Sequence, residues 1–147
     1  MTQPGLEGKH MTQKTFAAFA FAFGCLAALT GVARAEDAAG DAALGEKVFN
    51  KCRPCHMIGE TAKNSVGPVL NGVIGRKAGI YEGYNYSEAN KGSGLTWDEA
   101  TFREYIHAPQ AKVKGTKMVF AGITNDTDVS NLIAYLKSYD AAGKKTP

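Results

Sequence analysis

The chain has no internal repeat, no strand-like alternation of apolar and polar residues, and no apolar run of comfortable membrane-spanning length. These absences argue against a sheet-based fold and against a membrane-spanning segment. Apolar residues do recur at helical spacing, in stretches separated by long glycine-containing segments. The sequence therefore predicts helices joined by long loops.

The first 35 residues have the pattern of an export signal. Two lysines precede an apolar run from Thr15 to Leu29, and Ala33-Arg34-Ala35 fits a small-residue cleavage site. We expect residues 1–35 to be a cleaved signal peptide and residues 36–147 to form one domain in the periplasm. An uncleaved membrane anchor is the alternative.

The chain also lacks a strong excess of charge of either sign. Its 17 basic and 14 acidic residues give a formal net charge of +3. Without the leader, 14 basic and 13 acidic residues remain, a net charge of +1. Nucleic-acid binding is dominated by neutralisation of phosphates, so this balance argues against a nucleic-acid partner.

Both ends of the domain are predicted to be helical. Asp41 is placed to cap a helix over residues 42–52, in which Gly45 suggests close packing of another helix. The last helix is expected to begin at residue 125 or 126. Its apolar residues recur at i, i+3, i+4 and i+7 from Val129.

One further helix and long loops are predicted between these ends. Thr96 and Glu99 have the spacing of a capping box for a helix that ends before Pro109. A short helical turn is expected near residues 87–90, and residues 110–123 should be an irregular loop. Loops this long are unusual in a compact domain, and a large internal cofactor would fill the space beside them.

The stretch Cys52-Arg53-Pro54-Cys55-His56 matches the attachment signature of a c-type haem. Each thiol can add to one vinyl group of the porphyrin, which places His56 under the iron. Structural zinc generally needs four Cys or His ligands, and the domain offers only His107 besides these three. A redox dithiol would stand in a βαβ pattern, which is absent. The sequence therefore predicts one haem c bound covalently through Cys52 and Cys55.

The second axial ligand is predicted by elimination to be Met118. Met57 adjoins His56 and cannot reach the opposite face of the ring. His107 stands at a helix end, where polar residues are usually solvated. Ligation by Met118 and His56 raises the iron's reduction potential and leaves no open position for a substrate. The expected chemistry is one-electron cycling between Fe(III) and Fe(II), and not enzymatic turnover.

Polar groups around the haem are expected to orient it. A backbone carbonyl in the Gly67-Pro68 loop is a candidate acceptor for the second nitrogen of His56. Arg76, Tyr86 and Trp97 have the donors that haem propionates need. From the residues alone, Tyr86 and Trp97 could equally belong to the core.

Taken together, these motifs resemble class I cytochrome c, especially the bacterial periplasmic carriers similar to the mitochondrial protein. The matching segments span nearly all of the domain. They are Gly45, Phe49, Cys52 to His56, Val66 to Pro68, Gly75-Arg76, Tyr86, Asn90, Leu95 to Trp97, Tyr105, Gly115 to Ile123 and Leu132 to Leu136.

The resemblance implies an all-α class I cytochrome c fold, with crossing N- and C-terminal helices and long loops wrapped around one covalent haem. It implies that the Pro68 carbonyl accepts from His56, that Met118 binds the iron, and that Gly45 lets the two helices approach. Further residues are assigned to the surroundings of the haem. They are Arg76, Tyr86 and Trp97 around the propionates, Asn90, Tyr105 and Thr116 in a polar network on the methionine side, and Phe120 over the haem near its exposed edge.

Two features depart from the family pattern. Lys114 stands where the family usually has a proline before Gly-Thr-Lys-Met, so the Met118 loop could open more easily. Gln110 and Ala111 stand where mitochondrial-type carriers tend to have lysines. We therefore expect weaker electrostatic docking than in a strongly basic relative.

The resemblance implies a monomeric periplasmic carrier that meets the membrane surface only transiently. Its donor would be a quinol-oxidising cytochrome complex, and its acceptor a terminal oxidase or photosynthetic reaction centre. Two alternatives stay open. One is a haem peroxidase or small-molecule sensor in which Met118 leaves the iron, and the other is an anchored electron-transfer subunit that keeps its apolar segment.

Overall fold

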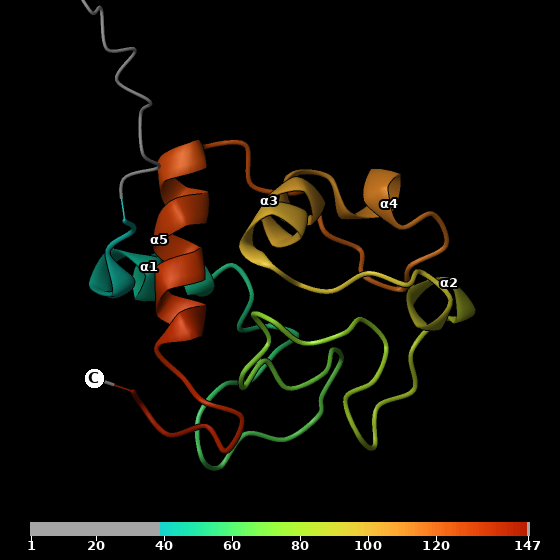
Figure 1. Cartoon of the computed structure of the whole chain (residues 1–147), viewed down its shortest axis with the longest axis horizontal. Helices are drawn as coiled ribbons and strands as arrows, with labels where there is room; N and C mark the ends of the chain where they lie inside the picture. The colour runs from blue at the N-terminus through green and yellow to red at the C-terminus, as the bar shows by residue number, and fades with distance from the viewer. Residues whose placement is uncertain (1–38, 147) are drawn as a thin grey trace, which may run out of the picture. The chain divides into compact units, whose positions relative to one another are not determined.

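The computed structural model of the chain describes residues 39–146, so the expected leader, residues 1–35, lies outside the described residues. The described part contains five helices and no strand beyond isolated bridges (Figure 1). The helices are α1 (Ala42–Phe49), α2 (Glu88–Lys91), α3 (Glu99–His107), α4 (Pro109–Lys112) and α5 (Asp126–Lys137). The predicted all-α class is confirmed.

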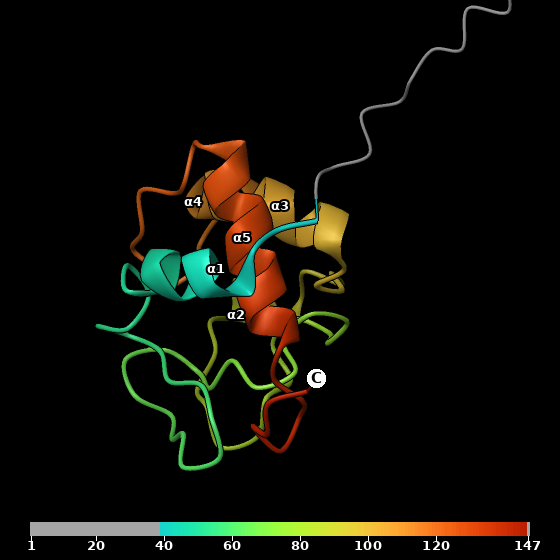
Figure 2. The ribbon, with the colours of Figure 1, turned by 90° about the vertical axis from the view of Figure 1, so that its left-hand side faces the viewer.

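Helices α1 and α5 cross, as two perpendicular views show (Figures 1 and 2). The Asp41 carboxylate caps α1 by accepting from the backbone N–H groups of Ala43 and Leu44 at 2.7 and 3.0 Å. The Asp41 N–H donates to the Asn131 side chain of α5 at 2.7 Å. A Cβ on Gly45 would overlap the Asn131 carbonyl, so this close crossing requires glycine.

The start of α3 differs from the prediction. The N-cap is Asp98, whose carboxylate accepts from the Thr101 N–H at 2.8 Å, so the capping box of Thr96 and Glu99 is wrong. Thr96 instead lies opposite Lys77 in an isolated antiparallel bridge. An aspartate directly before the helix competes for the cap position as well as threonine does.

The segment after α3 also differs. Residues 110–123 were expected to be irregular, but Pro109 starts the short helix α4, where its fixed φ suits the first turn. The rest of the segment has no regular structure and returns to α3, where the Ile123 N–H donates to the Ile106 carbonyl at 2.9 Å. This segment carries Met118.

The core is formed mainly by the apolar faces of three helices. Its buried helical members are Val48 and Phe49 of α1, Phe102, Tyr105 and Ile106 of α3, and Val129, Leu132, Ile133, Tyr135 and Leu136 of α5. Most of the periodic apolar residues of these helices therefore lie inside, whereas Leu44 of α1 is exposed.

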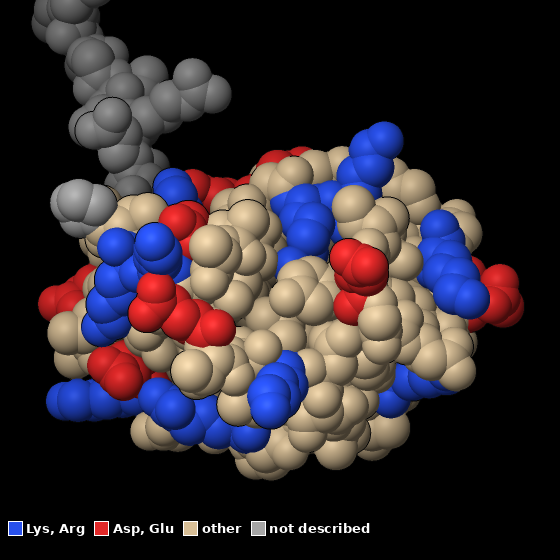
Figure 3. All heavy atoms as spheres, turned by 90° about the horizontal axis from the view of Figure 1, so that it is seen from below, with Lys and Arg blue, Asp and Glu red and all other residues tan. Residues whose placement is uncertain are grey.

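Charges of both signs are mixed on the surface of the protein. On the face seen in Figure 3, basic and acidic side chains are interspersed and separated by uncharged residues. Most of the ion pairs are solvent-exposed, as between Lys51 and Asp128 at 3.5 Å. None of the helices described within residues 39–146 is long and apolar enough to cross a membrane.

Candidate haem site

A cavity lies among the core helices and the loops, and its volume of about 780 Å³ includes the open space at its mouth. Its apolar wall comes from Phe49, Leu70, Val73, Phe102, Ile106, Leu132 and Leu136. Its polar and sulfur-bearing lining comes from Cys52, His56, Arg76, Tyr86, Ser87, Asn90, Trp97, Tyr105, Thr116, Lys117 and Met118, and Pro68 completes it. A largely apolar cavity with a few convergent polar groups is typical of a cofactor site.

Successive turns after α1 place the attachment motif at this cavity. The Cys52 N–H donates to the Phe49 carbonyl at 2.8 Å, and the His56 N–H donates to the Cys52 carbonyl at 2.9 Å. Burial raises the pKa of the Cys52 thiol to about 11, although Lys51 opposes this. The motif is therefore held in a compact turn against the helix that precedes it.

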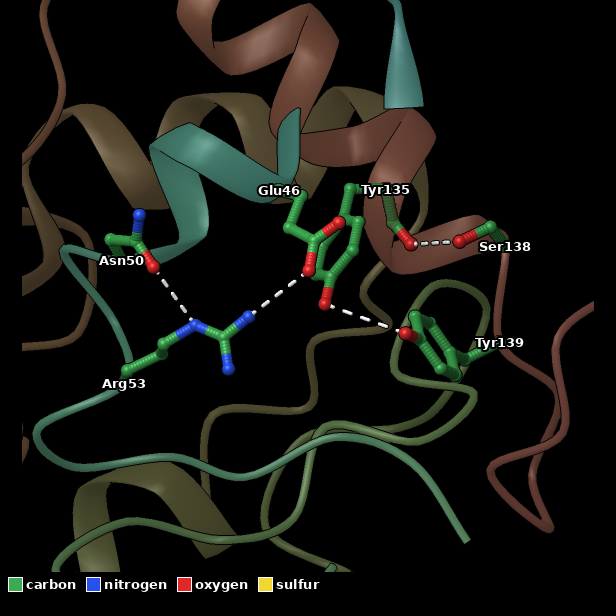
Figure 4. A network of polar contacts seen from close by, with 6 residues as sticks. All are labelled: Glu46, Asn50, Arg53, Tyr135, Ser138 and Tyr139. Atoms are coloured by element: carbon green, nitrogen blue, oxygen red, sulfur yellow. Dashed lines mark hydrogen bonds and ion pairs between the residues drawn. The ribbon is translucent and has the colours of Figure 1, made fainter. Parts of the chain in front are cut away.

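Arg53, inside the motif, ties this turn back to α1 (Figure 4). Its Nε donates to Asn50 at 2.9 Å, and a terminal nitrogen lies 3.3 Å from the Glu46 carboxylate. The same view shows the hydroxyls of Tyr135 and Tyr139 facing each other, 3.5 Å apart. The motif and the end of α5 thus flank the same region of α1.

The His56 ring is oriented by a backbone acceptor. Its Nδ1 lies 2.7 Å from the Pro68 carbonyl, which leaves Nε2 for a metal. Burial is the main cause that lowers the pKa of His56, and the positive charge of Arg76 adds to it against the opposing Pro68 hydrogen bond. The neutral imidazole, which is the form that binds metals, is favoured.

The Arg76 guanidinium is fixed beside the cavity. Its terminal nitrogens donate to the carbonyls of Asn71 and Val69 at 2.9 and 3.0 Å. Trp97 is brought alongside because its backbone N–H donates to the Arg76 carbonyl at 2.9 Å. Arg76 Nε is the one buried side-chain nitrogen or oxygen without a hydrogen-bond partner among residues 39–146. Tyr86 also lines the cavity.

Met118 stands in a second polar group of the same cavity. The Tyr105 hydroxyl donates to the Met118 sulfur at 3.2 Å, and the Met118 N–H donates to the Thr116 hydroxyl at 3.2 Å. Burial, the largest cause, raises the pKa of Tyr105, while hydrogen bonds with Thr116 and Asn90 oppose it. The three side chains expected to form a polar network on this side are thus coupled.

The structure brings ten of the twelve expected site residues to the cavity wall. They are Cys52, His56, Pro68, Arg76, Tyr86, Asn90, Trp97, Tyr105, Thr116 and Met118. Cys55 is half-buried within the same turn but does not line the cavity. Phe120 packs partly buried against the core and lines a separate groove with Val119 and Ala121.

Several lining residues were not named as site residues from the sequence. Phe102 and Ile106 of α3, and Leu132 and Leu136 of α5, belong to apolar helical stripes that read as ordinary core. Their i, i+4 spacing was the available signal. Leu70 and Val73 lie in irregular backbone, where no periodicity could have indicated them.

These residues fit a covalently attached haem. The Cys52 thiol and a neutral imidazole with a free Nε2 line a largely apolar cavity, and the Cys55 thiol stands in the same turn as both. The orphaned Arg76 Nε is a donor that a haem carboxylate would satisfy. A thioether sulfur is present in the same cavity.

Comparison with known proteins gives one consistent family. The sequence profile described as Cytochrome c matches residues 42–140. Cytochrome c2 of Blastochloris viridis is 56% identical over 123 residues, which cover 84% of this chain and 95% of that protein. Cytochrome c2 of Rhodoblastus acidophilus is 63% identical over 107 residues, which cover 73% of this chain and 100% of that protein.

A solved structure with the same fold is that of cytochrome cH from Methylobacterium extorquens. It superposes with a TM-score of 0.64 at 52% sequence identity, covering 67% of this chain and 99% of that chain.

Proposed function

The chain belongs to the cytochrome c family, as a class I member, and we propose that it is a soluble periplasmic one-electron carrier. It holds one haem c covalently, through Cys52 and Cys55. The haem, when bound, supplies the Fe(III)/Fe(II) couple. The chain's own residues decide whether this couple serves electron transfer or catalysis.

Two side chains of this chain would bind the haem iron. His56 would bind it through Nε2, because Nδ1 is engaged by the Pro68 carbonyl, and Met118 would bind it through its sulfur. The observation that carries the proposal is that both side chains line one cavity whose remaining wall is largely apolar. A site closed in this way excludes water and substrate, so no enzymatic activity is proposed.

The route of the electrons and the compartment are inferred from the family resemblance. We place a quinol-oxidising cytochrome complex as donor, and a terminal oxidase or photosynthetic reaction centre as acceptor. Residues 1–35 act as a cleaved export signal, and residues 36–147 work as a monomer that meets redox proteins transiently.

The ligation is tested by spectroscopy on the oxidised protein and on Met118→Ala. The oxidised wild type should have the weak red absorption band of a sulfur-to-ferric-iron bond, and the variant should lose it. The reduced wild type should bind carbon monoxide slowly, whereas the variant should bind it quickly. Rapid carbon monoxide binding and peroxide turnover by the wild type would support a peroxidase or sensor instead.

The compartment is tested by fractionating cells and sequencing the N-terminus of the haem protein. Recovery from the periplasmic fraction with Glu36 as first residue is expected. Recovery from membranes with the apolar run intact would support an anchored subunit.

A further inference from the structure

The Tyr81 ring packs against the cation that borders the haem cavity. The Arg76 guanidinium carbon is 4.6 Å from the centroid of the Tyr81 ring, within the range of a cation–π contact. Both side chains are half-buried. The ring therefore packs against the guanidinium and reduces its contact with water.

The other contacts of Arg76 leave its Nε without an acceptor. The carbonyls of Asn71 and Val69 each accept from a terminal nitrogen, which fixes the plane of the guanidinium. Nε is buried and has no partner among residues 39–146. Each terminal nitrogen keeps a second N–H, but Nε is the buried nitrogen with no acceptor at all, so it is the donor that most needs one from a ligand in the cavity.

Tyr81 also contacts a second residue of the cavity wall and lines a groove on the outer surface. A hydrogen bond with the Tyr81 backbone lowers the pKa of Tyr86, against the larger raising effect of burial. On the outer side, Tyr81 and Val69 line a surface groove together with Lys63 and Glu82. Tyr81 thus borders both this groove and the guanidinium.

We propose that Tyr81 is a positioning residue for the haem site: its ring holds Arg76 with Nε available to a haem carboxylate and keeps water off the guanidinium. This inference rests on the proposed placement of Arg76 beside the haem carboxylates. A cation near the iron stabilises the ferrous state, which carries one positive charge fewer than the ferric state. Water at the guanidinium raises the local dielectric constant and weakens that effect.

The test is a double-mutant cycle on the haem-loaded protein, with the midpoint potential at neutral pH as readout. Tyr81→Ala should lower the potential, and Tyr81→Phe should leave it unchanged because the phenyl ring keeps the stack. Arg76→Gln should lower it further. In the Arg76→Gln background, Tyr81→Ala should have no additional effect.

A second readout reports on the guanidinium itself. The NMR signal of Arg76 Nε–H should exchange with water roughly tenfold faster in Tyr81→Ala than in the wild type or in Tyr81→Phe. A drop in potential that persists in the Arg76→Gln background, or an unchanged exchange rate, would overturn the inference. If Arg76→Gln itself leaves the potential unchanged, the placement of Arg76 is wrong, and the role of Tyr81 is wrong with it. A normal Arg76→Gln response with no effect of Tyr81→Ala refutes the role of Tyr81 alone.

Discussion

The Tyr105 hydroxyl donates a hydrogen bond to the Met118 sulfur across 3.2 Å. A donor on that sulfur withdraws electron density from the proposed iron ligand and so favours the ferrous state. Tyr105→Phe should therefore lower the midpoint potential. The net worth of a hydrogen bond, about 0.5–1.5 kcal/mol, corresponds to roughly 20–65 mV for one electron.

Tyr139→Phe is the matched control, because its hydroxyl meets that of Tyr135 and not the methionine. Its potential should equal that of the wild type in the same redox titration. An equal drop in both variants would mean that the Tyr105 hydroxyl acts by some route other than Met118.

Lys114→Pro should stabilise the protein. The Thr116 N–H donates to the Val113 carbonyl at 3.1 Å, and Gly115 has φ +88°, which together describe a type II turn with Lys114 at its second position. Proline favours that position, and among the described contacts the Lys114 N–H donates no hydrogen bond. The free energy of unfolding in urea should rise by about 0.4–1 kcal/mol.

Lys112→Pro, two residues earlier in the chain, is the comparison variant for Lys114→Pro. There the backbone N–H donates to the Ala108 carbonyl at 3.1 Å, and proline would remove this hydrogen bond within α4. This variant should be less stable than the wild type. A loss of stability in Lys114→Pro would show that the 113–116 turn differs from type II.

The sequence predicted the parts of the site that depend on neighbouring residues, namely the contiguous haem motif and the helix that Asp41 caps beside it. Met118, far along the chain, was predicted by eliminating the other possible iron ligands. The sequence did not indicate the pairing that sets Trp97 beside Arg76, because hydrogen bonds between two irregular segments leave no periodic pattern. The true N-cap of α3 was missed because two adjacent signals competed, and the Asp98 carboxylate is the one that reaches Thr101.

Gly45→Ala tests the helix crossing. Alanine is the better helix former by about 1 kcal/mol, yet its Cβ would overlap the Asn131 carbonyl of α5. Forced overpacking of this kind costs about 1–3 kcal/mol, so the variant should unfold at lower urea concentration. The exposed Ala43→Gly on the same helix should cost no more than about 1 kcal/mol. A stabilised Gly45→Ala would contradict the close crossing.

Ionisation of the Tyr135 phenol should make the protein less stable at high pH. Burial, the largest cause, and the neighbouring Tyr139 raise the pKa of Tyr135 above its usual 10.0. The unfolded chain therefore loses this proton first, so the stabilisation is complete below pH 10 and declines as pH rises toward the folded pKa. Tyr135→Phe should reduce the slope of unfolding free energy against pH, above pH 10, by up to about 1.4 kcal/mol per unit. An unchanged slope would mean that the phenol ionises equally in both states.

Two surface lysines that would attract an anionic partner are paired with acidic neighbours. Lys51 lies 3.5 Å from the Asp128 carboxylate, and Lys112 pairs with Glu104. The Lys117 ammonium donates to the neutral Asn85 carbonyl at 3.0 Å. Oxidation of the ferrous protein by the anionic reagent ferricyanide should therefore depend only weakly on salt. Asp128→Asn removes the negative charge that is paired with Lys51. It should therefore speed this reaction at low salt and steepen its salt dependence.

Glu60→Gln makes the same change in net charge at a residue without an ion pair among those described in residues 39–146. It should alter the rate less than Asp128→Asn, because steering at close range depends on the local field more than on total charge. A cationic oxidant should respond in the opposite direction, with Asp128→Asn slowing it at low salt. Equal effects of the two substitutions on both reagents would show that only net charge matters, and that Lys51 has no special place in docking.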